Sequence, residues 1–235
     1  MKATNHQSSQ DLATFLGQLL TADDRQTTGT VAAIFGRHGV AYAASEARVQ
    51  ALVQEIELDG GNTIANLTRR RGVSYERVVR DVCKQLKCKV LPEIKDNVPE
   101  MERQLVYHVI ANYLQNAPEV DRNVLLAALR ERGVNWRPSV QGAVTAAMWA
   151  SLLQQAGARV AAQAVRQVVL RTSGWFAARA AAGTVLEVMA LAIPAVNVAM
   201  TAWLVVNVAD PAYRKTVPTV LDIALLRMEF GADVN

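Results

Sequence analysis

The stretch GGNTIANLTRRRGVSYERVVRDVCKQLK, residues 60–87, decides the fold class of this chain. Gly60 and Gly61 are placed to end one helix, because glycine enters the left-handed conformation of a helix end without steric cost. Asn62 or Thr63 can cap the next helix, and Ser74 can cap a further one. Apolar residues repeat at helical spacing along that last helix, at Val78, Val79, Val82 and Leu86. We therefore predict consecutive amphipathic helices with clear start and stop signals.

The rest of the chain extends this pattern. Ser8 or Ser9 can cap a helix that begins near Asp11. The glycine-rich region 27–42 shows no clear period, whereas the last segment, DPAYRKTVPTVLDIALLRMEF at residues 210–230, predicts an amphipathic helix. Apolar spacing predicts further helices over residues 45–58, 100–115 and 119–131. The predicted fold class is all-α: a multi-helix bundle with a hydrophobic C-terminal helical pair.

A turn-rich connector with two prolines, residues 91–99, suggests a division of the chain. We expect an N-terminal helical subdomain over residues 1–92, which carries a basic helix. A C-terminal helical subdomain over residues 93–235 follows and contains an apolar, hairpin-like segment at 180–209. The total of 235 residues suits one large domain or two small ones.

Residues 188–209, VMALAIPAVNVAMTAWLVVNVA, carry no charge. As a helix they would span about 33 Å, close to the roughly 30 Å of a bilayer's hydrocarbon core. Two interpretations stay open: a core helix pair, or a membrane-seeking hairpin that bends near Pro194 and Asn197. Glu187 would then lie at the interface or pair with Arg179, since charge at mid-bilayer is costly. The candidate residues of this membrane or core hairpin are Trp149, Glu187, Pro194, Asn197 and Trp203.

The chain is mildly basic, with a net charge of +4 from 25 basic and 21 acidic residues. Eight basic residues between Arg69 and Lys89 accompany only Glu76 and Asp81. A solvated helix end explains them without a ligand, because cations favour the negative end of a helix. The alternative is a surface for a charged partner, such as anionic lipid. The candidate charged-partner surface comprises Arg69, Arg70, Arg71, Arg77, Arg80, Lys84 and Lys87.

No catalytic or metal-binding motif is visible. His6, His38 and His108 lie in separate segments without metal-ligand spacing, and the Gly60–Gly61 pair lacks the lysine of a phosphate loop. Cys83 and Cys88, if both were helical, would point to different sides, so no disulfide is expected. No secretory signal is recognised in the N-terminal segment, so a reducing, cytoplasmic setting is the default. We expect a non-enzymatic protein with no cofactor and no metal.

Three blocks carry a family resemblance: LATFLGQLLT at residues 12–21, GGNTIANLTRRRG with RVVRDVCKQLK at 60–87, and AYRKTVPTVLDIALLR at 212–227. They resemble blocks of YaaW-like proteins, bacterial proteins of unassigned function that are distantly grouped with ubiquinol–cytochrome c chaperones. The match is weak over residues 91–209. The resemblance implies an α-helical protein that could hold a partner, and it transfers no catalytic residue.

These observations support two main hypotheses. In the first, a non-enzymatic protein associates with the inner membrane through the apolar helical pair and the basic helix surface, by the logic of pore-forming helical bundles. In the second, an assembly-chaperone-like module binds a protein partner in a helical groove. The predicted partner is thus anionic lipid or a protein, nucleic acid is disfavoured, and the protein is cytoplasmic or bound to the inner membrane.

Overall fold

A computed structural model describes residues 4–21, 25–60, 72–116, 119–131, 133, 146–163 and 211–230. Within these ranges the regular structure is helical and no strand occurs, which confirms the all-α prediction. The predicted hydrophobic pair at 180–209 and the predicted helix at 62–72 lie largely or wholly outside them. The elements are α1 (Thr4–Leu19), α2 (Arg25–Arg37), α3 (Glu46–Gly60), α5 (Tyr75–Gln85), η1 (Pro92–Ile94), α6 (Val98–Asn116), α7 (Glu119–Arg130), α8 (Ala146–Ala156) and α12 (Pro211–Phe230).

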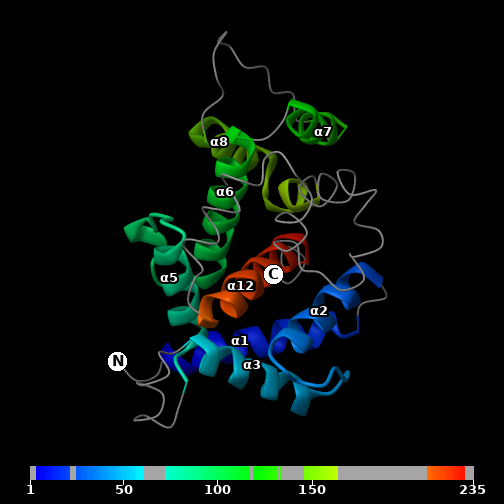
Figure 1. The fold of residues 1–235 in the computed structure, drawn as a ribbon, viewed down its shortest axis with the longest axis vertical. Coiled ribbons are helices and arrows are strands. Elements are labelled where there is room, and N and C mark those ends of the chain that lie inside the picture. The colour runs from blue at the N-terminus through cyan, green and yellow to red at the C-terminus, as the bar shows by residue number, and fades with distance from the viewer. Residues whose placement is uncertain are drawn as a thin grey trace.

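Helix α12 lies in the middle of the described helices and contacts α2, α3, α5 and α6 (Figure 1). Every residue from 216 to 226 is buried. A helix buried on all sides has no solvent-facing polar stripe, so the prediction of an amphipathic helix at 210–230 is wrong for this segment. Its polar residues mislead because Asp222 and Arg227 pair with charges from other helices instead of facing water.

Serines that were expected to cap α1 link it to neighbouring helices instead. Because α1 begins at Thr4, Ser8 and Ser9 lie inside it. Ser8 Oγ accepts a hydrogen bond from the backbone N–H of Glu76, 3.4 Å away in the first turn of α5. Ser9 Oγ donates to the Glu57 carboxylate on α3. The capping prediction for Ser8 and Ser9 is therefore wrong, and these hydroxyls position α5 and α3 against α1.

Helix α2 occupies the region whose glycines obscured the sequence pattern. Val31, Ile34 and Phe35 recur at helical spacing and are fully buried. Gly29 and Gly36 have no other group near the position of a Cβ, so they contribute weak propensity and no packing. Helix α3, by contrast, buries the stripe that its sequence predicted, Val49, Leu52, Val53 and Ile56.

A buried ion pair joins the two longest described stretches of helix, α6 and α12. Arg227 Nε lies 2.8 Å from Glu102 Oε2, and the Tyr75 hydroxyl of α5 donates to Glu102 Oε1 at 2.6 Å. The Arg227 guanidinium also lies 4.7 Å from the centre of the Phe15 ring of α1. Burial raises the pKa of Glu102, while Arg227 and Tyr75 oppose this rise. Four helices therefore meet at one charge pair.

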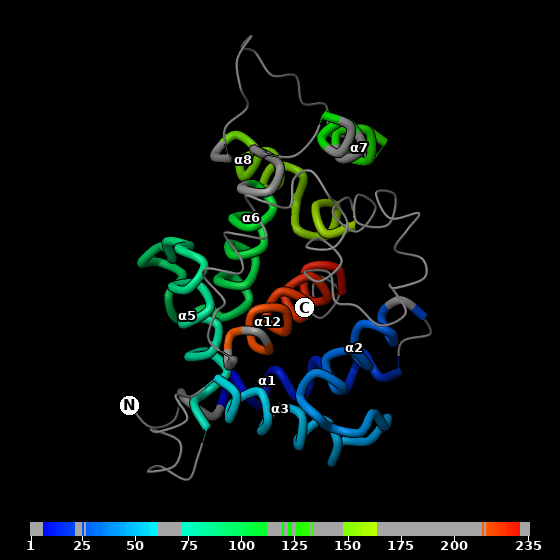
Figure 2. The backbone as a smooth tube through the Cα atoms, viewed as in Figure 1, coloured from blue at the N-terminus to red at the C-terminus, as the bar shows by residue number. Residues whose placement is uncertain are grey.

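The predicted boundary between residues 92 and 93 falls inside the short turn η1. Helix α12 nevertheless packs on α2 and α3, which precede this turn, and on α6, which follows it. The tube in Figure 2 shows this return of the chain, with the C-terminal helix set among helices from the first half. The chain thus brings its last described helix back to its first ones.

Candidate functional site

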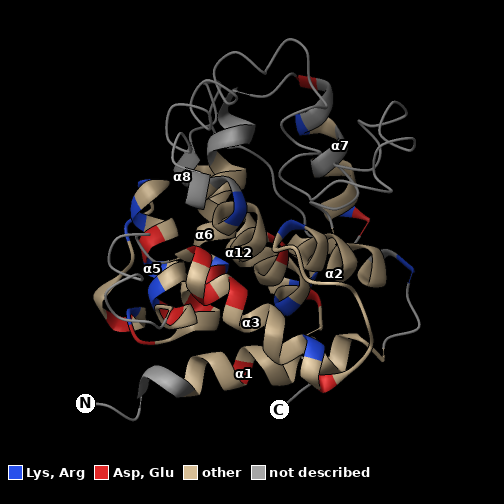
Figure 3. Cartoon of the chain, turned by 60° about the horizontal axis from the view of Figure 1, so that its bottom comes forward, with Lys and Arg blue, Asp and Glu red and all other residues tan. Residues whose placement is uncertain are grey.

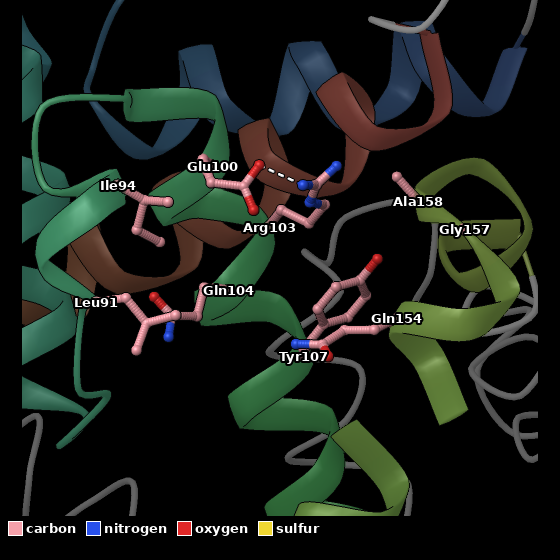
Figure 4. Close-up of a pocket in the computed structure, with 9 residues that line it drawn as sticks. All are labelled: Leu91, Ile94, Glu100, Arg103, Gln104, Tyr107, Gln154, Gly157 and Ala158. Carbon is pink, nitrogen blue, oxygen red and sulfur yellow. Dashed lines mark hydrogen bonds and ion pairs between the residues drawn. The ribbon is translucent and has the colours of Figure 1, made fainter. Parts of the chain in front are cut away.

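A cleft beside α6 is the clearest candidate site in the described part of the chain (Figure 4). Its volume is about 310 Å³, at the lower end of the range for ligand sites. Three elements form its walls: the η1 turn, one face of α6, and the end of α8. The lining residues of this α6 cleft are Leu91, Ile94, Glu100, Arg103, Gln104, Tyr107, Gln154, Gly157 and Ala158.

The η1 turn supplies the apolar wall. Pro92 stands at its first position, where its fixed φ angle suits a helical start. Leu91 precedes the turn and is 54% exposed, which is unusual for a leucine among so many buried ones. Ile94 ends the turn and lines the cleft next to it. A partner's apolar side chain could therefore remove Leu91 from water.

The polar wall comes from one face of α6, because Glu100, Arg103, Gln104 and Tyr107 recur at i, i+3, i+4 and i+7. Asn97 Oδ1 accepts from the Glu100 N–H at 3.2 Å and so caps the start of this helix. The Arg103 guanidinium forms an ion pair with the Glu100 carboxylate. Burial raises the pKa of the Tyr107 phenol, so its hydroxyl keeps its proton at neutral pH.

Gln104 has the least satisfied side chain of the α6 cleft. Its Nε2 donates to the backbone carbonyl of Lys89 at 2.9 Å, which determines the orientation of the amide. Its Oε1 is buried and has no hydrogen-bond partner among the described residues. A buried acceptor without a donor is costly, about 1–3 kcal/mol, and such atoms are rare in native proteins.

The third wall depends on a glycine. Gly157 has a φ angle of +81°, a left-handed conformation that other residues adopt with strain. It follows Ala156, the last residue of α8, and redirects the chain into the helical residues 158–163. Gln154 and Ala158 thereby face the cleft from opposite sides of this break. The cleft combines apolar surface, amides and one guanidinium, which are groups suited to a peptide.

A second groove lies between α1 and α3, with a volume of about 500 Å³. Small or uncharged side chains, such as Ala13, Gly17 and Ala44, form much of its lining. None of its lining residues has a buried polar atom without a partner. The groove therefore offers shape but few groups that would select a ligand.

Of the four described residues of the predicted charged-partner surface, three pair with carboxylates of the protein. Arg77 Nε lies 2.8 Å from Asp81, and Lys84 Nζ lies 3.7 Å from the same carboxylate. Arg80 pairs with Glu76 and approaches Asp96 at 3.6 Å. Figure 3 shows acidic and basic positions interspersed along α5. Lys87 is exposed just beyond the helix, while Arg69, Arg70 and Arg71 lie outside the described residues.

Of the predicted membrane or core hairpin, the structure describes only Trp149. This residue lies in α8 and is 1% exposed, packed in the hydrophobic core. The other members, Glu187, Pro194, Asn197 and Trp203, lie outside the described ranges. Among the helices that the structure does describe, none is both long and apolar enough to cross a bilayer.

Sequence reasoning missed a buried polar cluster around His38. His38 Nδ1 lies 2.7 Å from Asp59 Oδ2, and its Nε2 lies 2.9 Å from the Thr219 hydroxyl. Lys215 Nζ donates to both Asp59 oxygens at 3.1 Å. Burial lowers the pKa of His38 from 6.5 to about 4, although Asp59 opposes this shift. The imidazole is therefore neutral at pH 7, with Nδ1–H donating to Asp59 and Nε2 accepting from Thr219.

A second ion pair completes this His38 cluster. Arg37 donates to Thr219 Oγ1 at 2.7 Å and to Asp222 Oδ2 at 3.1 Å. The order carboxylate, imidazole, hydroxyl resembles that of a hydrolase triad. Thr219 is fully buried, however, so its hydroxyl is not accessible to a substrate in this conformation. The cluster joins α12 to α2 and α3.

One signal in the sequence could have revealed the cluster. Lys215, Thr219 and Asp222 recur at i, i+4 and i+7 in α12, so they share one face of this helix. Among the described residues, no group of three or more His, Cys, Asp or Glu side chains is placed to hold a metal.

Comparison with known proteins finds bacterial relatives at low identity. A UPF0174 protein of Helicobacter pylori strain 26695 is 28% identical over 208 residues, covering 84% of this chain and 95% of the relative. A UPF0174 protein of strain J99 is 24% identical over 201 residues, covering 83% and 76%. This similarity supports a relationship to an uncharacterised bacterial family. Neither relative carries the YaaW-like or chaperone name that the resemblance suggested. No protein-family model and no solved structure matches the chain.

Proposed function

We propose that this chain is a non-enzymatic binding protein whose α6 cleft receives a short segment of a protein partner, as an assembly factor would. The segment would place an apolar side chain against Leu91 and Ile94 and donate a hydrogen bond to Gln104. Its recognition would resemble other peptide-binding modes, in which pockets select side chains and polar groups hold the main chain.

The observation that carries this proposal is the buried Oε1 of Gln104, which has no donor in the described part of the chain. In the unbound cleft the amide is held in this orientation by the hydrogen bond from Nε2 to the Lys89 carbonyl. Because water does not reach this atom in the unbound cleft, we propose that binding shifts the Gln104 side chain enough for a backbone N–H of the peptide to donate to Oε1. The same contact would be less specific with lipid, whose acyl chains donate no hydrogen bond.

Charge also favours a protein over a membrane surface. The basic residues of α5 that the structure describes pair mainly with Glu76, Asp81 and Asp96. Paired charges contribute less to the attraction of anionic headgroups than free ones do. The membrane hypothesis stays a prediction that depends on residues 188–209 and on Arg69–Arg71, which lie outside the described residues.

A displayed library of random peptides, selected on the purified chain, tests the proposal. Selected peptides should bind the wild type, and their Kd should rise about tenfold or more in Gln104→Ala and in Leu91→Asp, since loss of about 1.4 kcal/mol weakens binding tenfold. Leu58→Asp is the matched control, because Leu58 is a 42% exposed leucine on α3 that does not line the cleft. Fluorescence anisotropy measures the affinities, and melting temperatures verify folding.

The proposal fails if selection enriches no peptide, or if the two cleft variants bind as tightly as the wild type and Leu58→Asp. Flotation with phosphatidylglycerol vesicles at low salt provides the competing measurement. The membrane hypothesis would be favoured instead if the wild type floats with the vesicles and the cleft variants bind peptide as tightly as the wild type.

A further inference from the structure

Two cysteine thiols meet where α5 ends. The helix ends at Gln85 with Leu86 as its C-cap residue, and Lys87 adopts a left-handed φ angle of 56°. The Lys87 N–H donates to the Lys84 carbonyl at 3.1 Å, and the Cys88 N–H donates to the Cys83 carbonyl at 2.8 Å. These two bonds define a Schellman motif, in which the first and last residues commonly place their side chains in contact.

In this motif the two contacting residues are Cys83 and Cys88, and both thiols are free. The Cys88 nitrogen lies 2.8 Å from the Cys83 carbonyl oxygen, so the two side chains start from neighbouring backbone positions. The expectation that a spacing of five separates them is therefore wrong, because Cys88 lies beyond the helix and the Lys87 turn folds it back. Cys83 is 1% exposed and Cys88 is 7% exposed, so Cys88 is the more accessible thiol.

We propose that Cys83 and Cys88 form an oxidation site that closes to an intrachain disulfide and thereby reshapes one wall of the α6 cleft. The second part of this inference rests on the proposed function. The first part depends only on the Schellman geometry, in which the Cys88 nitrogen lies 2.8 Å from the Cys83 carbonyl oxygen and the two residues are neighbours in space.

A hydroperoxide is the oxidant class that balances the reaction. The neighbouring Cys83 thiol lowers the pKa of Cys88, and Cys88 is the less buried of the two residues, so we assign Cys88 as the attacking thiolate. It displaces hydroxide from hydrogen peroxide and becomes a sulfenic acid. The Cys83 sulfur then attacks the Cys88 sulfur, and the sulfenic oxygen leaves as water. The protein loses two protons and two electrons, and one peroxide becomes two waters.

The backbone connects this pair to the α6 cleft within three residues. Lys89 follows Cys88 and its carbonyl holds Gln104 Nε2 at 2.9 Å. Leu91, two residues later, lines the cleft. A disulfide draws the sulfurs to about 2.05 Å, which moves Cys88 and the chain that leaves it. We therefore expect the Lys89 carbonyl to shift relative to Gln104 and peptide affinity to fall.

Peroxide titration of the full chain tests the inference with two independent readouts. Alkylation with N-ethylmaleimide followed by peptide mass mapping should show a Cys83–Cys88 cross-link, lighter by two hydrogens, that dithiothreitol reverses. The Kd of a library-selected peptide should rise about fivefold or more on oxidation. Fivefold is the lower end of the usual change in affinity when one site is coupled to another. Cys88→Ala and Cys83→Ala/Cys88→Ala should bind the peptide with or without peroxide, and melting temperatures check that both fold.

Loss of alkylation shows the peroxide concentration at which either thiol is consumed. If no cross-link is found at that concentration, the proposed oxidation site is wrong. A complete cross-link with an unchanged Kd would overturn its link to the cleft while the proposed function stands. If the reduced wild type binds no selected peptide, the proposed function and the link fall together, and mass mapping still decides whether the disulfide forms.

Discussion

Acidification from pH 7 to pH 5 should destabilise this fold through His38. The ring is buried between α2, α3 and α12, with Asp59 on one nitrogen and Thr219 on the other. Two cations, Arg37 and Lys215, also lie near it. Burial is the largest cause that lowers its pKa from 6.5 to about 4, and both cations act in the same direction.

The sign of the effect follows from proton binding. The folded state keeps His38 neutral, whereas the unfolded chain binds a proton below pH 6.5. This contribution to stability is therefore complete above pH 6.5 and is lost as the pH falls towards 4. At pH 5 the unfolded residue is almost fully protonated and the folded one is mostly neutral. The difference amounts to about 2 kcal/mol, a large part of a typical stability.

Urea unfolding followed by circular dichroism at pH 7 and pH 5 measures this effect. The comparison variant is His38→Gln, which keeps a hydrogen-bonding side chain and does not titrate. Between the two pH values the wild type should lose about 2 kcal/mol more unfolding free energy than the variant. Burial also lowers the pKa of His108, but His108 is present in both proteins and cancels.

Equal losses of stability in the wild type and His38→Gln would refute the reasoning. That result would mean that His38 takes up its proton in the folded state as easily as in the unfolded chain. The cluster would then be open to water at pH 5, contrary to its burial.

Two further predictions concern the fold. Arg227→Leu should lower the unfolding free energy by about 3–5 kcal/mol, because Glu102 stays buried without its counter-charge. The double variant Glu102→Gln/Arg227→Leu should recover most of this loss in the same urea experiment. If it does not, the loss does not come from the unpaired charge of Glu102. Gly72→Ala should destabilise the folded protein by about 1–3 kcal/mol, because a Cβ there would lie 2.5 Å from the backbone carbon of Glu57. Gly29→Ala should stabilise the folded protein by about 0.5–1 kcal/mol, because Gly29 lies in α2 with open space around its Cβ position. Equal effects of the two alanines on thermal unfolding would contradict this assignment.

Local patterns predicted several helices well. The stripe of α3 is buried as predicted, and the apolar residues of α5 at helical spacing, Val78, Val79 and Val82, all lie in the core. Residues 25–37 escaped prediction because their glycines weaken a period that Val31, Ile34 and Phe35 nevertheless carry. Ser8 and Ser9 misled because a hydroxyl can cap its own helix or bond to another, and spacing does not distinguish the two.

The helical character of the chain and the residues that share a helix face follow from local spacing and turn chemistry, so both can be predicted from the sequence. What lies opposite each face depends on how the helices pack against one another. Lys215, Asp222 and Arg227 are charged residues of α12 whose partners come from other helices, Asp59 of α3, Arg37 of α2 and Glu102 of α6. The α6 cleft likewise needs Leu91, Gln104 and Gly157 from three separate elements. Contacts between elements distant in sequence depend on packing, which no local pattern encodes.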